Sequence, residues 1–237
     1  MIDEAVFRKA YPGTSHDGTV AFYQWVRQHV SPGTILLNLG AGPATGSRIR
    51  SFRGEVARAI GVDVDDAVLT NAELDEAHVI RRGRIPLPDD SVDLIVCDYV
   101  FEHIADPQQF LGEAHRVLRP GSHLFFRTPN VYHYVSLIAV ATPHWFHALV
   151  ANRARGLDHA AHEPYPTYHR LNTRRRIRRE AQRAGFSAAE LRMFEGEPSY
   201  LMFSRPTFAL GVAYERVVNA SEALSPLRAG ILGKLTR

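Results

Sequence analysis

The stretch ILLNLGAGPATGSRI, residues 35–49, determines the fold that we expect. Its first five residues are largely apolar and predict a buried strand, and the glycines at Gly40 and Gly42 predict a tight turn. Helix-compatible residues follow, and we expect a short helix over 46–52. A strand, a glycine turn and a helix in this order present bare backbone to a ligand in α/β proteins. We therefore expect a small molecule to bind at this turn.

Strands and helices alternate from this stretch to Asn130. We expect strands at 59–64, around Val79 and Ile80, at 92–99 and at 122–128, and helices at 17–29, 67–74 and 107–118. Such alternation predicts a parallel sheet with helices on both faces, because parallel neighbours require a crossover connection.

This alternation ends after Asn130. Residues 131–172 are rich in aromatics, histidines and prolines, and residues 197–228 are irregular and helical. Between and after these two blocks we expect a helix at 173–185 and strands at 189–194 and 231–237. No internal repeat or low-complexity linker separates two domains. We therefore predict one domain over 1–237, with a helical cover (1–34), a cofactor-binding core (35–130) and the two blocks as insertions that form a lid over the substrate pocket.

The glycine turn resembles a dinucleotide-binding turn only in part. Gly40 and Gly42 fit the G-x-G-x-x-G pattern, but Thr45 stands at the third glycine position. Pro43 removes one backbone donor that a phosphate would use. We therefore favour a ligand with an adenosine and no phosphate.

An acid at the end of the second strand supports a nucleoside ligand. Asp63 lies 21 residues after Gly42, where a carboxylate can accept both hydroxyls of a ribose. Asp65 and Asp66 are competitors for this role, but both suit the start of a helix better. Asp63 is therefore the expected ribose ligand.

At this point the chain resembles the class I S-adenosylmethionine-dependent methyltransferases. LLNLGAGPATGSRI (36–49) is similar to their glycine-rich motif, IGVDVDD (60–66) to their second motif, and residues 86–130 to the region of their third to fifth strands. The resemblance implies a Rossmann-like, doubly wound α/β fold with a seven-stranded sheet whose last strand is antiparallel. It also implies S-adenosylmethionine as the cofactor.

The resemblance also implies which residues bind the cofactor. They are Asn38, Gly40, Ala41 and Gly42 at the methionine part, Asp63 at the ribose, Val64, Gly83, Arg84 and Ile85 around the adenine, and Asp98 and Tyr99 near the sulfonium. The family usually has an acid where Asn38 stands, and often one near the adenine, where this chain reads RRGRIPLP (81–88). These two contacts therefore differ from the family pattern.

Methyl transfer from a sulfonium mainly requires that the protein position the acceptor and exclude water. A general base is needed only when the acceptor is a poorly ionised hydroxyl. His103, just after the fourth strand, is the candidate base. Alternatively, it packs against the cofactor at the start of a helix. Tyr132, His133 and His169 are weaker candidates. Histidines also cluster between 123 and 169, but none matches H-E-x-x-H, and we expect no metal.

Charge and composition limit the partners. The chain has 28 Lys+Arg, 25 Asp+Glu and a net charge of +3, with −5 in residues 1–120 and +8 in 121–237. The arginine-rich helix at 173–185 most simply presents a solvated face, with contact to an anion or a membrane surface as the alternative.

A lone cysteine, Cys97, excludes an internal disulfide and falls in an apolar run. No secretion signal or membrane-spanning stretch stands out, so we expect a cytoplasmic protein.

The aromatic insertions favour a partly apolar substrate. We therefore predict methyl transfer to a small molecule, at a hydroxyl of a sugar-containing, polyketide-like or lipid-like compound. One alternative is a nucleic-acid methyltransferase, which the arginine helix favours. Enzymes that methylate the amino groups of bases usually have an (Asn/Asp)-Pro-Pro-aromatic loop after the fourth strand. This chain has CDYV (97–100) there, which disfavours this alternative. The other is a non-catalytic binding module. The sequence does not predict the oligomeric state.

Overall fold

The computed structural model describes residues 2–136 and 165–237. These residues form two compact units. Unit 1 consists of the described parts of 1–21, 129–166 and 193–230, and unit 2 consists of 22–128, 167–192 and 231–237. Residues 137–164, which include His144, His147 and the histidines of 158–163, lie outside the described residues.

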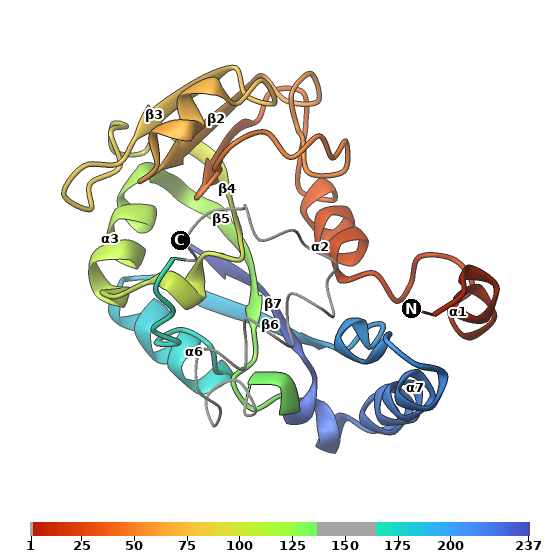
Figure 1. Ribbon diagram of the computed structural model, residues 1–237. Coiled ribbons are helices and arrows are strands. Elements are labelled where there is room, and N and C mark those ends of the chain that lie inside the picture. Colours follow the sequence, from red (N-terminus) through yellow and green to blue (C-terminus); the bar gives the residue numbers. More distant parts are fainter. Residues whose placement is uncertain (1, 137–164) are drawn as a thin grey trace. The chain divides into compact units, whose positions relative to one another are not determined.

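A seven-stranded sheet forms the centre of unit 2 (Figure 1). Its strands are β1 (Ile35–Leu39), β2 (Arg58–Asp63), β3 (Glu76–Val79), β4 (Val92–Asp98), β5 (Leu118–Pro129), β6 (Ala188–Phe194) and β7 (Gly230–Thr236), in the order β3-β2-β1-β4-β5-β7-β6. Strands β1 to β5 pair in parallel. Strand β7 runs against β5, because Gly121 bonds to Arg237 at one end and Asn130 bonds to Ala229 at the other. The predicted fold, an α/β sheet with an antiparallel last strand, is confirmed.

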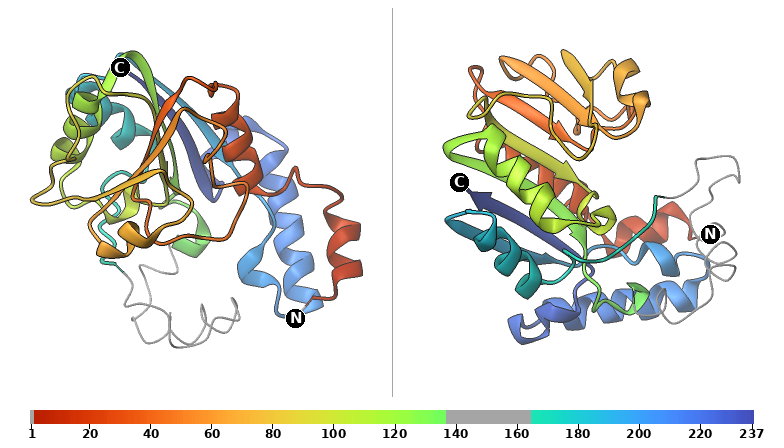
Figure 2. Two further views of the ribbon diagram at one scale, coloured as in Figure 1. Left: turned by 90° about the horizontal axis from the view of Figure 1, so that it is seen from above. Right: turned by 90° about the vertical axis from the view of Figure 1, so that its left-hand side faces the viewer.

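Helices cover both faces of this sheet, as the unbroken apolar run of β4 requires. Five of the seven β4 residues are buried, Cys97 among them. Helix α2 (Gly18–Arg27) covers one face and packs the Trp25 ring edge-on against Phe125 at 5.2 Å. Helices α3 (Pro107–Val117) and α6 (Arg174–Arg183) lie together on the other face (Figure 2). Gln108 of α3 donates a 2.7 Å hydrogen bond to Glu180 of α6.

Capping side chains begin both of these helices. Asp106 accepts hydrogen bonds from the backbone N–H groups of Gln108 and Gln109 and begins α3. Thr173 accepts from the N–H of Arg176 and begins α6, as expected. The buried stripe of α6 contains Ile177 and Ala181, so most of its arginines face solvent.

Two expected helices are wrong. Residues 46–52 form a loop, because Gly46 is left-handed (φ +70°) and donates a 2.6 Å hydrogen bond to Glu73, 27 residues away. The expected helix at 67–74 is a short 3-10 helix, η1 (Asp66–Thr70). It stops there because the side chain of Asn71 bonds instead to Gly42 O and to the N–H of Glu73.

Unit 1 contains helices α1 (Glu4–Ala10) and α7 (Arg205–Asn219) and the 3-10 helices η3 (Ser199–Leu201) and η4 (Glu222–Leu227). Aromatic rings join α1 and its C-cap to α7: Phe7 lies 6.3 Å and Tyr11 6.2 Å from Phe208. Within the described residues, no helix combines the length and apolarity that a bilayer crossing requires.

Candidate cofactor and catalytic site

The glycine turn after β1 is bent by backbone hydrogen bonds to β2. The N–H groups of Gly40 and Ala41 donate to Val62 O at 2.8 and 3.1 Å, and Gly40 is left-handed (φ +84°). A Cβ on Gly40 would stand 2.3 Å from Cγ2 of Val100, so only glycine fits there. A Cβ on Gly42 (φ +54°) would meet only Oδ2 of Asp63, at 4.0 Å. The backbone at Gly42 is therefore a cradle that a side chain would fill.

Asp63 fixes the same turn. Its Oδ2 accepts the N–H of Gly42 at 2.8 Å, and its Oδ1 accepts the N–H of Asp65 at 3.0 Å. A carboxylate has about four lone-pair positions, so each oxygen can still accept a hydroxyl. Asp65 caps η1 by accepting from Ala67, as expected, whereas Asp66 pairs with Arg81 at 2.8 Å. Of the three acids, Asp63 is the one beside the glycine turn.

The other predicted cofactor residues around the adenine lie on two loops of unit 2. Val64 follows β2 and is 58% exposed. Gly83 and Arg84 are exposed in a tight turn closed by the N–H of Arg84 on Arg81 O at 3.1 Å, whereas Ile85 is buried. Asn38 lies within β1, in register with Gly61 of β2 and with Val96 of β4.

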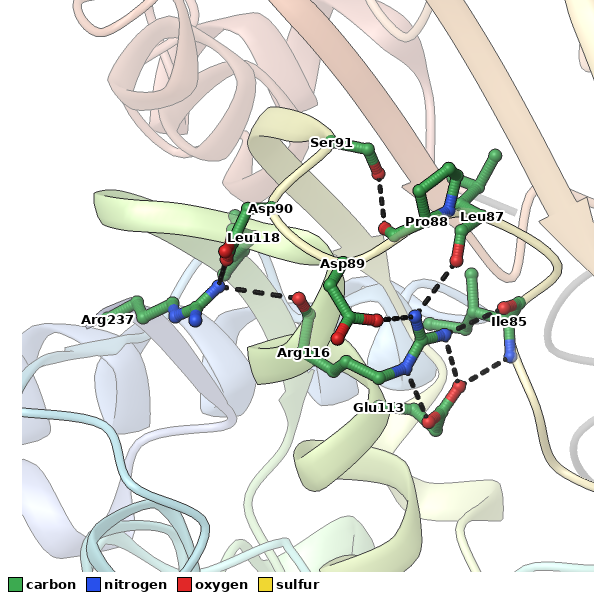
Figure 3. A network of polar contacts seen from close by, with 10 residues as sticks. All are labelled: Ile85, Leu87, Pro88, Asp89, Asp90, Ser91, Glu113, Arg116, Leu118 and Arg237. Carbon is green, nitrogen blue, oxygen red and sulfur yellow. Dashed lines mark hydrogen bonds and ion pairs between the residues drawn. The ribbon is translucent and has the colours of Figure 1, made fainter.

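Arg116 of α3 holds the loop that carries Ile85 (Figure 3). Its guanidinium donates to Ile85 O and to Leu87 O, both at 2.9 Å, and pairs with Asp89 and with Glu113. Glu113 also accepts the N–H of Ile85 at 2.9 Å. The hydrogen bond from Arg116 lowers the pKa of Glu113, more than its partial burial raises it. This network fixes the backbone of residues 85–89 against α3.

Asp98, at the end of β4, belongs to a buried polar cluster. Its carboxylate accepts a 2.9 Å hydrogen bond from the hydroxyl of Tyr23 and forms an ion pair with Arg127. Burial raises the pKa of Tyr23, and the charge of Asp98 raises it further. Burial alone would lower the pKa of Arg127, but the bond to Asp98 reverses the direction. Arg50 also lies 3.6 Å from the Asp98 carboxylate, so three side chains surround it.

Tyr99 continues from this cluster in a left-handed conformation (φ +56°) that non-glycine residues seldom adopt. Its N–H donates to Arg127 O at 3.0 Å, and its ring lies 4.6 Å from the Arg127 guanidinium carbon. The ring is 47% exposed. The strained backbone therefore presents this aromatic side chain at the carboxyl end of β4.

The structure brings two of the four candidate bases together. His103 ends the 3-10 helix η2 (Phe101–His103), and the carbonyl of Glu102 accepts the N–H groups of Tyr168 and His169 at 2.8 and 3.2 Å. Burial lowers the pKa of His169, and the charge of His103 lowers it further. Its Nδ1 is buried without a hydrogen-bond partner among the described residues.

The other two candidate bases, Tyr132 and His133, belong to unit 1. Tyr132 is 55% exposed, and His133 is buried 3.5 Å from Glu195.

Buried polar side chains support the turn that carries His103. Thr128 donates a 3.0 Å hydrogen bond to the carboxylate of Glu102 and accepts one of 2.7 Å from Asn172. Burial raises the pKa of Glu102 more than these bonds lower it. This network joins β5, η2 and the segment before α6.

Residues 37–126 match the model of a methyltransferase domain family. These residues are therefore a methyltransferase domain. A probable S-adenosylmethionine-dependent methyltransferase of Mycolicibacterium smegmatis is 39% identical over 106 residues, which are 43% of this chain and 40% of that protein. The ubiquinone biosynthesis O-methyltransferase of Pseudomonas syringae is 27% identical over 128 residues, which are 48% of this chain and 53% of that protein.

The chain thus spans about half the length, or less, of these curated relatives. Its fold is also that of a solved S-adenosylmethionine-dependent methyltransferase from Archaeoglobus fulgidus, with a TM-score of 0.57, 16% identity, and coverage of 99% of this chain and 100% of the other. At this identity the likeness concerns the fold alone.

Methyltransferases of this class use S-adenosylmethionine, and the residues of this methyltransferase domain suit that cofactor at two points. The cradle at Gly42 has room for a ligand against bare backbone, and Asp63 beside it has acceptor capacity for a diol. No group of three or more histidines, cysteines or acids suited to a metal occurs in residues 2–136 and 165–237. The cradle at Gly42 and the Asp63 carboxylate are the two features that would suit a nucleoside ligand.

Sequence reasoning missed several residues that position this methyltransferase domain's site. The ion pair of Glu113 and Arg116 could have been predicted from the sequence, because acidic and basic residues three apart on a helix face each other. The contacts of Tyr23 and Arg127 with Asp98 could not have been predicted, since these residues lie 75 and 29 positions from Asp98 in the sequence. Only the fold brings them to its carboxylate.

Proposed function

We propose that this protein transfers a methyl group from S-adenosylmethionine to a hydroxyl of a small molecule. The observation that carries the proposal is the bare backbone of Gly42 beside the carboxylate of Asp63. When bound, S-adenosylmethionine supplies an electrophilic methyl group. Gly40, Ala41 and Gly42 would hold its methionine part, and Asp63 would accept its ribose hydroxyls.

The two neighbouring histidines support a hydroxyl acceptor. A hydroxyl must lose a proton as it is methylated, and a base that is neutral near pH 7 can take it. We propose His103 as this base. The Glu102 carbonyl binds the N–H of His169 and so holds this residue beside His103, and burial lowers the pKa of His169. The O-methyltransferase among the relatives supports the same chemistry.

Calorimetry with S-adenosylmethionine tests the cofactor part of the proposal. Asp63→Ala is expected to lose binding, and Asp65→Ala is the matched control, because Asp65 caps η1 with a similar 2.8 Å bond outside the turn. Equal affinities for the two variants would contradict the role of Asp63.

Transfer of a labelled methyl group tests the acceptor. We expect label from S-adenosylmethionine to enter a small-molecule fraction of a cell extract, with His103→Asn reducing the rate at pH 7. Label in nucleic acid instead, or no release of S-adenosylhomocysteine with any fraction, would overturn the proposal.

A further inference from the structure

Helix α7 has two apolar faces, and the fold of unit 1 uses one of them. Phe208, Gly211 and Val218 are buried, and a Cβ on Gly211 would stand 2.4 Å from Pro198. The opposite face is exposed and carries a stripe that we define as Pro206, Leu210, Ala213 and Val217. These positions recur every three or four residues, so they form one line along the helix.

This stripe exposes large side chains. Leu210 is 67% exposed and Val217 is 58% exposed, and Phe203, which precedes the Ser204 cap of α7, is 54% exposed. These three side chains leave on the order of 300 Å² of apolar surface, the lower end of the range for the largest exposed patch on a monomer, which often has a function. A helix that only covers a core would be polar on its outer face.

The margin of the stripe is cationic. Arg205 and Arg216 are exposed on one side of it. Glu215, the acid of α7, is buried and pairs with Arg216 at 3.3 Å, which leaves Arg205 as the arginine of α7 without an acid of its own helix beside it. The guanidinium of Arg216 donates to Ala10 O at 2.9 Å, which brings the basic end of α1, with Lys9 exposed, to the same margin. An apolar stripe with a basic edge is the pattern of a helix that lies in the surface of an anionic membrane.

Other occupants fit the stripe less well. Pairing with a second copy would bring the cationic margins of two helices together, and the patch is small for a specific interface. Helix α6 has more arginines, but its apolar residues Ile177 and Ala181 are buried, so it has nothing to insert into lipid.

We propose that α7 docks this protein on anionic lipid surfaces, with Phe203, Leu210 and Val217 inserted among the acyl chains and Arg205 and Arg216 at the phosphates. Long basic side chains reach the headgroup level while an apolar face is buried. None of these residues is among those proposed for methyl transfer, so the test does not depend on the proposed function.

Co-sedimentation with vesicles tests the proposal directly. The full chain is expected to bind vesicles of phosphatidylglycerol and phosphatidylcholine, and Leu210→Asp to weaken binding at least about tenfold. Leu69→Asp is the matched control, because Leu69 on η1 is 57% exposed and lies outside the stripe. Residues 137–164 are the same in all these proteins, so any contribution from them cancels.

A charge variant and the oligomeric state complete the test. Arg205→Gln is expected to lower binding to the anionic vesicles about fivefold and to leave binding to pure phosphatidylcholine unchanged. Equal vesicle binding by Leu210→Asp and Leu69→Asp would overturn the proposal. So would sedimentation velocity showing a dimer that Leu210→Asp dissociates, because the stripe would then be an interface between copies.

Discussion

Replacing Gly42 by alanine separates the cofactor cradle from the stability of the fold. The new Cβ would have Asp63 Oδ2 as its nearest neighbour, at 4.0 Å, so it clashes with no protein atom. Its backbone cost is small as well. A left-handed alanine costs about 1–2 kcal/mol, offset by about 0.4–1 kcal/mol from the stiffer unfolded chain.

We therefore expect Gly42→Ala to lower the free energy of unfolding by only ~1 kcal/mol. For a chain of this length that corresponds to a fall of about 2–4 °C in Tm.

The same methyl group would stand where the methionine part of the cofactor is proposed to lie. Carbon atoms approach to about 3.5–4 Å, so a ligand in contact with the Gly42 backbone must shift or leave. A loss of at least ~1.4 kcal/mol, about tenfold in Kd, follows. Calorimetry with S-adenosylhomocysteine measures it, and thermal unfolding of the same samples measures the stability.

Gly46→Ala is the matched control for this prediction. Gly46 is also left-handed (φ +70°), and a Cβ there would have no neighbour within 4 Å. We expect the same small fall in Tm with unchanged affinity. If Gly42→Ala bound S-adenosylhomocysteine as tightly as Gly46→Ala, the cradle would not hold the cofactor and the reasoning would fail.

Three further predictions follow from the same unit. Asn38→Asp restores the acid usual in the family and should tighten S-adenosylmethionine binding several-fold by calorimetry; weaker binding would contradict a contact to the ammonium group. Glu102 has a raised pKa, chiefly from burial, so its contribution to stability is complete below the ordinary value near 4.5 and is lost as pH rises. Glu102→Gln should therefore gain stability relative to the natural protein between pH 4 and pH 8 in urea unfolding, and a constant difference would refute the assignment. Tyr23→Phe removes the donor to Asp98 and should cost about 1–3 kcal/mol in the same assay, whereas an unchanged midpoint would show that the bond contributes nothing.

The fold was predictable from the sequence because its signals are local. The apolar run of β4 needs cover on both faces wherever it occurs, and Asp106 and Thr173 cap helices through residues two or three positions away. The glycine turn was predictable for the same reason, since Gly40 and Gly42 allow a left-handed backbone that few other residues adopt.

Features that depend on distant residues were not predictable. The loop at 46–52 replaces a helix because Glu73 binds Gly46, and the partners of Asp98 come from other elements. The approach of His169 to His103 depends on the Glu102 carbonyl, which binds a segment more than sixty residues away. Both histidines are candidate bases from the sequence alone, but only the fold shows that they are neighbours.

A crystal structure with S-adenosylhomocysteine would show whether Asp63 and Gly42 hold the cofactor. We expect both ribose hydroxyls within about 3 Å of the Asp63 carboxylate, the range of a hydrogen bond, and the methionine part over the backbone of Gly42. A nucleoside bound elsewhere in the chain, with Asp63 bonded only to Gly42 and Asp65, would contradict it.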